Sequence, residues 1–425
     1  MKFTPARICQ LIFLALFVQT EYRGRDEINA AVNTFFRVDP LVLFSYLLAA
    51  KSWTWLLLPA VLMVVATLLL GRFFCGWICP LGTILDLLTS RIRKSAPIRA
   101  LKGNVKYWLL LPLLSASLFN LNLSGLLDPI AILLRGLTFL LYPLLGLTAR
   151  EGWVGLYHLV GERRDTLAPA YHLIRDNLLP FRDTIYPLAL LSAAILLGII
   201  ALERFETRNW CRNLCPLGTL LGWLGRFSIF NRVPTNLCRD CGKCREVCPT
   251  GFDQDVLLKE ECILCMECRQ GCPHGRIAFR PSFLMMGHGP VLPERRLLLG
   301  GVLGGVLLAV PARFRSPETD SRLLRPPGVR SEDDFLKRCV RCGECMKVCL
   351  KNALYPAAYQ AGLDGLIKTV KEPYLVEEIC NGCGICEKVC PLETKAGIEV
   401  FAVKNRAPIP QQSAGQEIKP ANPYP

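Results

Sequence analysis

The sequence predicts a chain in two parts: an α-helical membrane bundle made of a duplicated two-helix unit, then two small α+β domains that are rich in cysteine. Three observations carry this prediction. Long stretches without charge fill the first half, a short cysteine motif occurs there twice, and the second half holds four cysteine runs of one spacing. The 425 residues are 52% hydrophobic and include 21 cysteines and 4 histidines.

The cysteine content and the charge each argue against a class of protein. Disulfide frameworks belong to short secreted chains, whereas these cysteines stand in tight repeated runs that favour metal binding. The net charge of +15 could serve nucleic-acid binding, but beside apolar stretches it is better interpreted as a membrane-topology signal. There is no C-x-x-C-H motif and no histidine in a predicted span, which argues against c-type haem and haem b.

Four charge-free stretches are predicted to span a membrane, because a spanning helix needs about 20 apolar residues. They are Ile8–Thr20 (extended towards Phe3), Ser52–Gly71, Tyr107–Leu127 and Thr184–Leu202. A cleaved signal peptide is the alternative for the first stretch, but no A-x-A-like site follows it, so a retained helix is favoured.

Lysine and arginine outnumber acids at the N-terminus and in the 80–106 loop. By the positive-inside rule, both segments face the cytoplasm of a multi-pass protein in the bacterial inner membrane. The first pair of cysteine runs then also lies on the cytoplasmic side.

An internal repeat organises the apolar half. Each copy begins with an Asp-Pro pair, at Asp39 and Asp128, and ends in C-x3-C-P-L-G-T, starting at Cys75 and Cys211. The two thiols of each motif are four residues apart, which places them on one face of a helix.

Three interpretations of the repeated motif stay open. Four thiols from two repeats suit one shared cluster or one tetrahedral metal, and each pair could also form a redox-active disulfide. Buried structural cysteines are the third interpretation. The residues concerned are Cys75, Cys79, Cys211 and Cys215.

The second half carries four C-x2-C-x2-C-x3-C runs, which is the spacing of bacterial two-cluster ferredoxins. In that arrangement three cysteines of a run bind one [4Fe–4S] cluster and the fourth reaches the neighbouring cluster. The predicted ligand sets are Cys238, Cys241, Cys244 and Cys272 (cluster 1), Cys262, Cys265, Cys268 and Cys248 (cluster 2), Cys339, Cys342, Cys345 and Cys390 (cluster 3), and Cys380, Cys383, Cys386 and Cys349 (cluster 4).

Zinc is the alternative for such cysteine pairs, but zinc needs no third cysteine at this spacing. The third run departs from the pattern because Leu350 replaces the proline that follows the other three. An insertion, Tyr355–Val376, separates the third run from the fourth.

The expected domains are a membrane domain (1–228), a dicluster ferredoxin-like domain (229–281), a linker (282–329), a second dicluster domain (330–406) and a disordered tail (407–425). Within the linker, Arg295-Arg296 precede an uncharged run. If this run is a fifth span, the second dicluster domain lies in the periplasm, and the twin arginines, which resemble a Tat-type export signal, favour this interpretation. If it does not span, all four clusters are cytoplasmic, as the arginines that follow the run favour. Spanning is the preferred interpretation. Cys9 stands apart as a buried, inert thiol.

The first 280 residues resemble the NapH family of membrane quinol dehydrogenases. The resemblance rests on FCGWICPLG from Phe74 to Gly82 and WCRNLCPLG from Trp210 to Gly218. The remainder resembles the NapG/MauM ferredoxins through Arg295-Arg296, RPPG from Arg325 and FLKRCVRCG from Phe335. The resemblance implies a fusion of two subunits that passes electrons from membrane quinol to an acceptor.

The predicted function is therefore iron–sulfur electron transfer in contact with membrane lipid, with quinol as donor and a partner reductase or cytochrome as acceptor. Nucleic acid is not an expected partner. A non-enzymatic relay, a maturation factor for a metalloenzyme and a redox sensor are the alternatives. Quinol oxidation also needs proton acceptors, for which Asp39 and Asp128 are candidates by position, although helix capping before proline explains them more simply.

Overall fold

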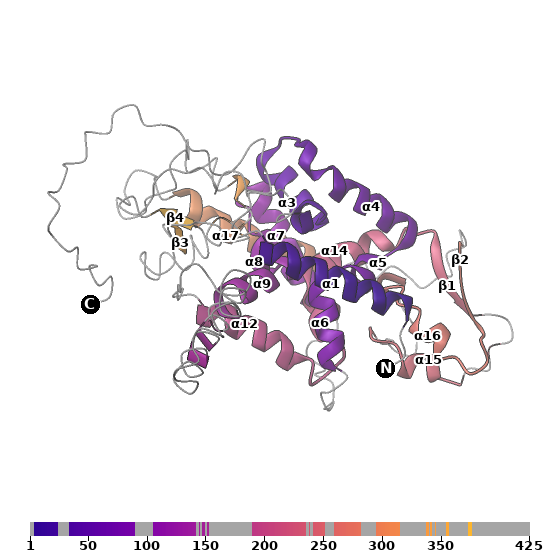
Figure 1. Cartoon of the computed structure of the whole chain (residues 1–425). Coiled ribbons are helices and arrows are strands. Elements are labelled where there is room, and N and C mark those ends of the chain that lie inside the picture. The colour runs from indigo at the N-terminus through magenta and orange to yellow at the C-terminus, as the bar shows by residue number, and fades with distance from the viewer. Residues whose placement is uncertain are drawn as a thin grey trace, which may run out of the picture.

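The computed structural model describes most of the helical half and the first dicluster domain (Figure 1). The described residues are 4–23, 34–89, 105–141, 189–234, 241–250, 259–281 and 295–314, together with strands at 354–356 and 373–375 and a few isolated positions. Within them the protein is mostly helical with little sheet.

The helical half consists of short helices joined by tight turns. In chain order they are α1 (Pro5–Arg23), α2 (Thr34–Arg37), α3 (Pro40–Ala50), the 3₁₀ turn η1 (Trp55–Leu57), α4 (Leu58–Leu70), α5 (Phe73–Trp77), α6 (Pro80–Thr89), α7 (Val105–Leu118), α8 (Ser124–Leu127), α9 (Pro129–Gly136), the π-helical η3 (Leu137–Leu141), α12 (Ala189–Leu202), α13 (Asn209–Asn213) and α14 (Pro216–Gly225).

The prediction of a membrane-spanning bundle is wrong for the described residues, since none of their helices combines the length and the apolar content needed to cross a bilayer. Stretch 52–71 divides into η1 and α4, which has only 13 residues. Stretch 107–127 breaks after α7, where Asn120 takes a left-handed φ of 65°. Thirteen residues rise about 20 Å, against about 30 Å of hydrocarbon. A stretch without charged residues is therefore not necessarily one helix, because turns within the apolar sequence end the helices early.

The internal repeat is visible in matching elements. An aspartate caps the first helix of each copy, with Asp39 before α3 and Asp128 before α9, and proline occupies the first turn of both. The cysteine motifs form a five-residue helix followed by a ten-residue helix in each copy, as α5 with α6 and α13 with α14. Both copies contribute to one continuous core of apolar residues, which also contains the four motif cysteines.

The first dicluster domain follows α14 and lies at the α5 end of the helical half (Figure 1). It comprises β1 (Phe230–Pro234), α15 (Lys243–Glu246), the 3₁₀ turn η5 (Lys259–Glu261), α16 (Glu267–Gln270) and β2 (Ile277–Pro281). Strands β1 and β2 pair antiparallel, from Phe230 opposite Pro281 to Pro234 opposite Ile277. Of the second dicluster domain, strands β3 (Leu354–Pro356) and β4 (Pro373–Leu375) form an antiparallel pair.

The linker contains α17 (Arg295–Phe314), which packs along α7. Ser115 of α7 donates its hydroxyl to the carbonyl of Gly301 at 3.3 Å. Glycines on this face of α17 let the two backbones approach, and a Cβ at Gly305 would overlap the Ser115 hydroxyl. The linker helix is therefore held against the helical half by a close contact in which glycines of α17 make room for side chains of α7.

We expect Gly305→Ala to destabilise the protein by about 1–3 kcal/mol, because the added methyl group overpacks the interface between α17 and α7. Gly304→Ala is the matched control, since its Cβ would lie in ordinary contact 3.6 Å from Pro112. Alanine at that position should be neutral or stabilising by up to about 1 kcal/mol. Urea unfolding of both variants measures the difference, and equal midpoints would contradict the close contact.

Candidate metal centre

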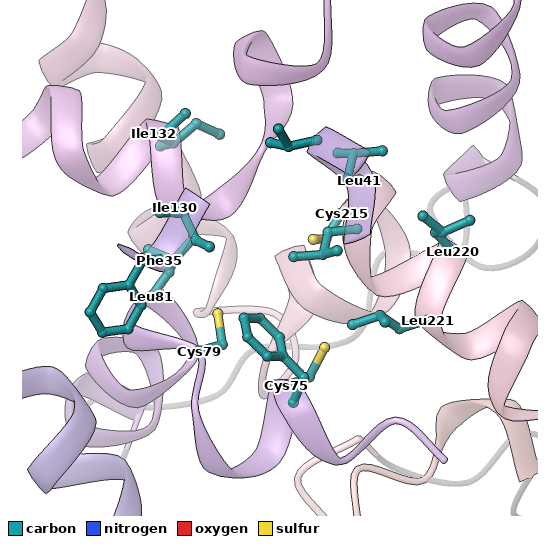
Figure 2. Packing of buried hydrophobic residues seen from close by; sticks show 14 of the residues in the cluster. Phe35, Leu41, Cys75, Cys79, Leu81, Ile130, Ile132, Cys215, Leu220 and Leu221 are labelled. Carbon is teal, nitrogen blue, oxygen red and sulfur yellow. The ribbon is translucent and has the colours of Figure 1, made fainter. Parts of the chain in front are cut away.

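Four buried thiols gather where the two repeats meet. Cys75 belongs to α5 and Cys79 precedes α6, and Cys211 and Cys215 take the same places at α13 and α14. Their sulfurs lie among core side chains such as Leu41, as Figure 2 shows for three of them. Every pair among the four lies within electrostatic range. We call this set the thiol quartet.

The quartet consists of free thiols with no disulfide between them. Burial, followed by the neighbouring thiols, holds the pKa of Cys79 and Cys215 well above the ordinary value for cysteine. Burial likewise raises the pKa of Cys211 to about 12. These three unligated thiols are therefore neutral, and binding of iron here must displace their protons. Across the part of the chain that is described, no three ligating side chains stand close enough to hold a single metal ion.

Two buried arginines join the repeats reciprocally. Arg72 stands three residues before Cys75, and Arg208 stands three residues before Cys211. The Arg72 guanidinium donates to the Cys211 carbonyl, and the Arg208 guanidinium donates to the Cys75 carbonyl at 2.6 Å. Each repeat thus fixes the backbone at the first cysteine of the other. Arg72 also lies within electrostatic range of the thiols of Cys75 and Cys215.

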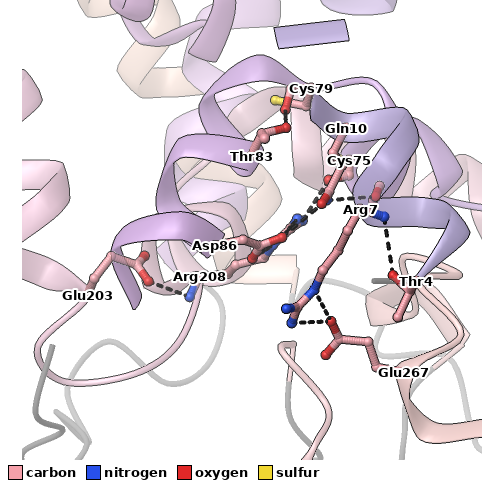
Figure 3. Close-up of polar contacts among 11 residues, drawn as sticks. Thr4, Arg7, Gln10, Cys75, Cys79, Thr83, Asp86, Glu203, Arg208 and Glu267 are labelled. Atoms are coloured by element: carbon pink, nitrogen blue, oxygen red, sulfur yellow. Dashed lines mark hydrogen bonds and ion pairs between the residues drawn. The ribbon is translucent and has the colours of Figure 1, made fainter. Parts of the chain in front are cut away.

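Carboxylates compensate both arginines. Asp86 of α6 receives two hydrogen bonds from Arg208, at 2.7 and 2.6 Å (Figure 3). Glu261 of the first dicluster domain receives one from Arg72 at 3.0 Å. Removing one partner from such a buried pair costs about 3–5 kcal/mol, because the other charge remains uncompensated. The geometry around the quartet is therefore strongly determined.

In the first dicluster domain, four thiols line one cavity: Cys248, Cys262, Cys265 and Cys268. This set is the one predicted for cluster 2, with three cysteines from one run and the last cysteine of the other. Arg232 and Phe279, on the two paired strands, also line the cavity. The donor set and the cavity fit a thiolate-held cluster.

The loop around this cavity has a special backbone. Leu264 and Met266, on either side of Cys265, both take left-handed φ angles of 53° and 60°. Turn conformations of this kind can point neighbouring N–H groups towards one side, which favours bound negative charge. Backbone N–H groups of Leu264 and Glu267 hydrogen-bond to the thiols of Cys262 and Cys265. Burial nevertheless raises the pKa of Cys262 to about 12.

The thiols predicted for cluster 1 are less enclosed. Cys238 and Cys241 are exposed, and Cys244 and Cys272 are half-buried. Arg232 donates to the Cys244 sulfur at 3.4 Å, and the backbone N–H of Arg276 donates to Cys272 at the same distance. This N–H group is the chief reason that the pKa of Cys272 lies below its usual value.

The last eight cysteines are mostly outside the described residues. Cys339 and Cys345 are described and half-buried. The remaining predicted ligands of clusters 3 and 4 lie outside the described residues: Cys342, Cys349, Cys380, Cys383, Cys386 and Cys390. The tail from 407 and most of the insertion between the last two runs also lie outside them.

The two candidate aspartates come together from the two repeats. Asp39 accepts from the backbone N–H of Leu41 at 2.7 Å, and Asp128 accepts from that of Ala131 at 2.8 Å, so both cap helices. Both are fully buried. Burial and then the charge of Asp128 hold the pKa of Asp39 well above its usual range. Burial also raises the pKa of Asp128, although Asp39, the Ala131 backbone and Arg135 act to lower it. Two carboxyls buried side by side cannot both ionise, so the pair keeps a proton, and Asp39 is the group whose pKa is raised more.

Several site residues were not anticipated from the sequence: Gln10, Arg72, Arg208 and Glu261. Gln10 of α1 donates to the Gly76 carbonyl at 2.8 Å and thereby steadies the first motif. The arginines had a detectable signal, since each stands three residues before the first cysteine of its motif. Glu261 had none, because its partner lies 189 residues away in the chain.

Three family descriptions match the chain. One described as a 4Fe-4S binding domain matches residues 52–99 and 186–234, the two segments that carry the repeated cysteine motif. A second 4Fe-4S binding domain matches residues 235–251 and 259–282, and a 4Fe-4S dicluster domain matches residues 338–394.

The chain is also similar to curated proteins. YccM of Escherichia coli (strain K12), named for electron transport, is 31% identical over 222 residues, which cover 51% of this chain and 53% of YccM. Ferredoxin-type protein NapH of Haemophilus influenzae is 24% identical over 65% of this chain and 88% of NapH. Methylamine utilization ferredoxin-type protein MauM of Methylorubrum extorquens is 37% identical over 24% of this chain and 49% of MauM.

The chain thus spans about half the length of YccM and MauM and most of NapH. The predicted resemblance to NapH joined to a MauM-type ferredoxin is confirmed. No solved structure matches the chain.

We expect Asp39→Asn to gain stability over the natural protein as pH rises from about 4 towards neutrality. Because the pKa of Asp39 is raised in the folded protein, its proton stabilises the fold fully below the unfolded pKa of about 3.9. This stabilisation is lost as pH rises from there through the raised pKa. Asparagine stays neutral and still caps the helix. Urea unfolding at several pH values measures the difference between the two proteins.

Asp39→Ala is the control for this measurement. It should follow the same pH trend from a stability that is lower by about 1 kcal/mol, since alanine removes the cap. A stability difference between Asp39→Asn and the natural protein that does not change with pH would contradict the shared proton.

Proposed function

Starting from the match to NapH-type iron–sulfur electron-transfer proteins, we propose that this chain oxidises quinol at the bacterial cytoplasmic membrane. The electrons pass through [4Fe–4S] clusters to a partner reductase or cytochrome. That the chain transfers electrons through iron–sulfur domains follows from its family matches and relatives. The donor, the number of clusters and the acceptor are the proposal.

The observation that carries this proposal is the position of the thiol quartet beside the cavity of cluster 2. Ile263, between Cys262 and Cys265, belongs to the same apolar cluster as the quartet. The Trp77 indole, between Cys75 and Cys79, donates to the Leu264 carbonyl at 3.0 Å. Two cysteine centres in contact are what a chain of one-electron carriers requires.

We assign the quartet to a fifth [4Fe–4S] cluster, in addition to the four clusters predicted from the ferredoxin runs. The assignment is supported by the 4Fe-4S family match to both of its segments. A bound cluster there would supply one-electron transfer. Arg72 and Arg208 would offset the negative charge that four thiolates bring into the core.

Oxidation of one quinol to quinone releases two electrons and two protons, so two one-electron carriers and two proton acceptors are needed. The aspartate pair holds one proton already and can take one more, on Asp128, and the second proton goes to water. Arg135, which faces Asp128, also donates to the carbonyl of Arg341 at 3.1 Å. Arg341 lies in the third cysteine run, so an electron acceptor would stand near this proton acceptor.

Contact with a membrane is supported by exposed apolar side chains on three helices. Ile12 of α1, Leu62 of α4 and Leu307 of α17 are more than half exposed, each with apolar neighbours on its own helix. Exposed apolar side chains that gather along a helix favour contact with a membrane or a protein.

We predict about 20 iron atoms per chain for the anaerobically purified protein and about 16 for Cys75→Ser, since each cubane holds four. Cys9→Ser is the matched control, because Cys9 is a single half-buried thiol in α1 outside every proposed ligand set, and it should leave the iron content unchanged. Equal iron in Cys75→Ser and the natural protein would exclude the fifth cluster.

We further predict that a soluble quinol analogue reduces the clusters anaerobically, with bleaching of their visible absorption. Asp128→Asn should slow this reduction, because it removes the free carboxylate of the pair. Reduction by dithionite is the control for intact clusters. Clusters that dithionite reduces and the quinol analogue does not would indicate a non-enzymatic electron relay instead.

A further inference from the structure

Two of the differences between the repeats lie where segment 259–264 of the first dicluster domain packs against them. Asp86, which compensates Arg208, lies eleven residues after Cys75, whereas the position eleven residues after Cys211 is Gly222. Gly76 follows Cys75 directly, and the equivalent residue after Cys211 is Arg212. The second repeat therefore lacks, at position 222, an acid that could pair with Arg72. The first repeat lacks a side chain directly after its first cysteine.

Segment 259–264 of the dicluster domain fills both places. Glu261 pairs with Arg72 in the way that Asp86 pairs with Arg208. It thereby replaces the acid that is absent at position 222. The backbone of this segment covers Gly222, since a Cβ there would come within 2.8 Å of the Glu260 carbonyl. A Cβ at Gly76 would overlap the Ile263 carbonyl, so the backbone meets the first motif as closely as possible.

Further ion pairs hold this segment and α16, the helix that follows it. Lys106 of α7 contacts the second oxygen of Glu261, and Arg226, next to α14, pairs with Glu260 at 3.0 Å. Arg7 of α1 pairs with Glu267 at 2.6 Å. Glu261 is nearly enclosed, and Arg72 and Lys106 each contact one of its two carboxylate oxygens.

We propose that Glu261 is a positioning residue that completes the second repeat from the dicluster domain. It holds segment 259–264 on the thiol quartet, so that cluster 2, rather than cluster 1, exchanges electrons directly with the quartet. This inference rests on the proposed function, because it requires a cluster in the quartet. Each transfer moves one electron, with one centre oxidised as the other is reduced. Arg208 supports the contact, since it lies within electrostatic range of both Cys211 and Cys265.

Cross-linking tests the docking independently of any cluster. A carbodiimide should join the Lys106 amine to the Glu261 carboxylate, and peptide mass spectrometry detects the product. Gly76→Ala should abolish this cross-link, because its methyl group displaces the Ile263 backbone. Gly198→Ala is the matched control, since nothing lies within 4 Å of its Cβ position, and it should keep the cross-link. A cross-link that persists in Gly76→Ala would overturn the docked geometry.

Electron paramagnetic resonance of the reduced protein tests the electronic contact. Cys75→Ser should alter the signal of cluster 2, because it removes a magnetic neighbour. Glu261→Gln keeps the shape of the side chain and removes its charge, so it serves as the second variant if Gly76→Ala does not fold. In a Glu261→Gln background, the effect of Cys75→Ser on the cluster 2 signal should shrink or disappear. Glu206→Gln is the control, since it weakens the pair of Glu206 with Arg212, which involves no residue of segment 259–264, and it should leave the alteration intact.

The outcomes separate this inference from the proposed function. Unchanged iron in Cys75→Ser would remove the fifth cluster and with it the electron route, while the cross-link still reports the docking. Loss of iron without any change in the cluster 2 signal would overturn the neighbour relation and leave the proposed function standing. Equal spectral effects of Glu261→Gln and Glu206→Gln would remove Glu261 from its positioning role.

Discussion

The arrangement depends on two arginines that each reach from one repeat into the other. Arg72 and Arg208 are almost fully buried, and a buried guanidinium must find acceptors for its hydrogen bonds and a carboxylate for its charge. Each takes a backbone carbonyl at the first cysteine of the opposite repeat. The two motifs are thereby locked face to face, and the four thiols come together without any covalent link.

The acids that satisfy these arginines determine what else is attached to the core. Asp86 is supplied from within the first repeat, whereas Glu261 comes from the dicluster domain. The need to compensate Arg72 thus becomes a reason for the two parts of the chain to dock in one orientation. Gly76 and Gly222 remove the side chains that would keep the parts separate. One electrostatic requirement links the fold of the helical half to the spacing of its redox centres.

The two repeats also contact each other through a pair of carboxyl groups, Asp39 and Asp128. Asp39 and Asp128 cap equivalent helices, and the duplication that places two thiol pairs together also places these carboxyls together. Two such groups cannot both ionise in a buried site, so they share a proton. Capping explains why each aspartate is where it is, and the pairing gives the two a chemistry that neither has alone. Duplication has produced both pairings from one set of local signals.

Local sequence determined the features that depend on a few neighbouring residues: the C-x3-C-P turns, the Asp-Pro caps, the order of the repeat and the spacing of the ferredoxin runs. Each is specified by short-range hydrogen bonding or by the reach of successive thiols, so spacing alone reveals it. Helix length was not determined in this way, because the charge-free stretches contain turns that hydropathy does not register. Only the tertiary structure decided that Arg72 and Arg208 each reach into the other repeat, that Asp39 faces Asp128, and that Glu261 pairs with Arg72. Those contacts join residues far apart in the chain, and they form because buried charges and polar groups must find partners wherever packing provides them.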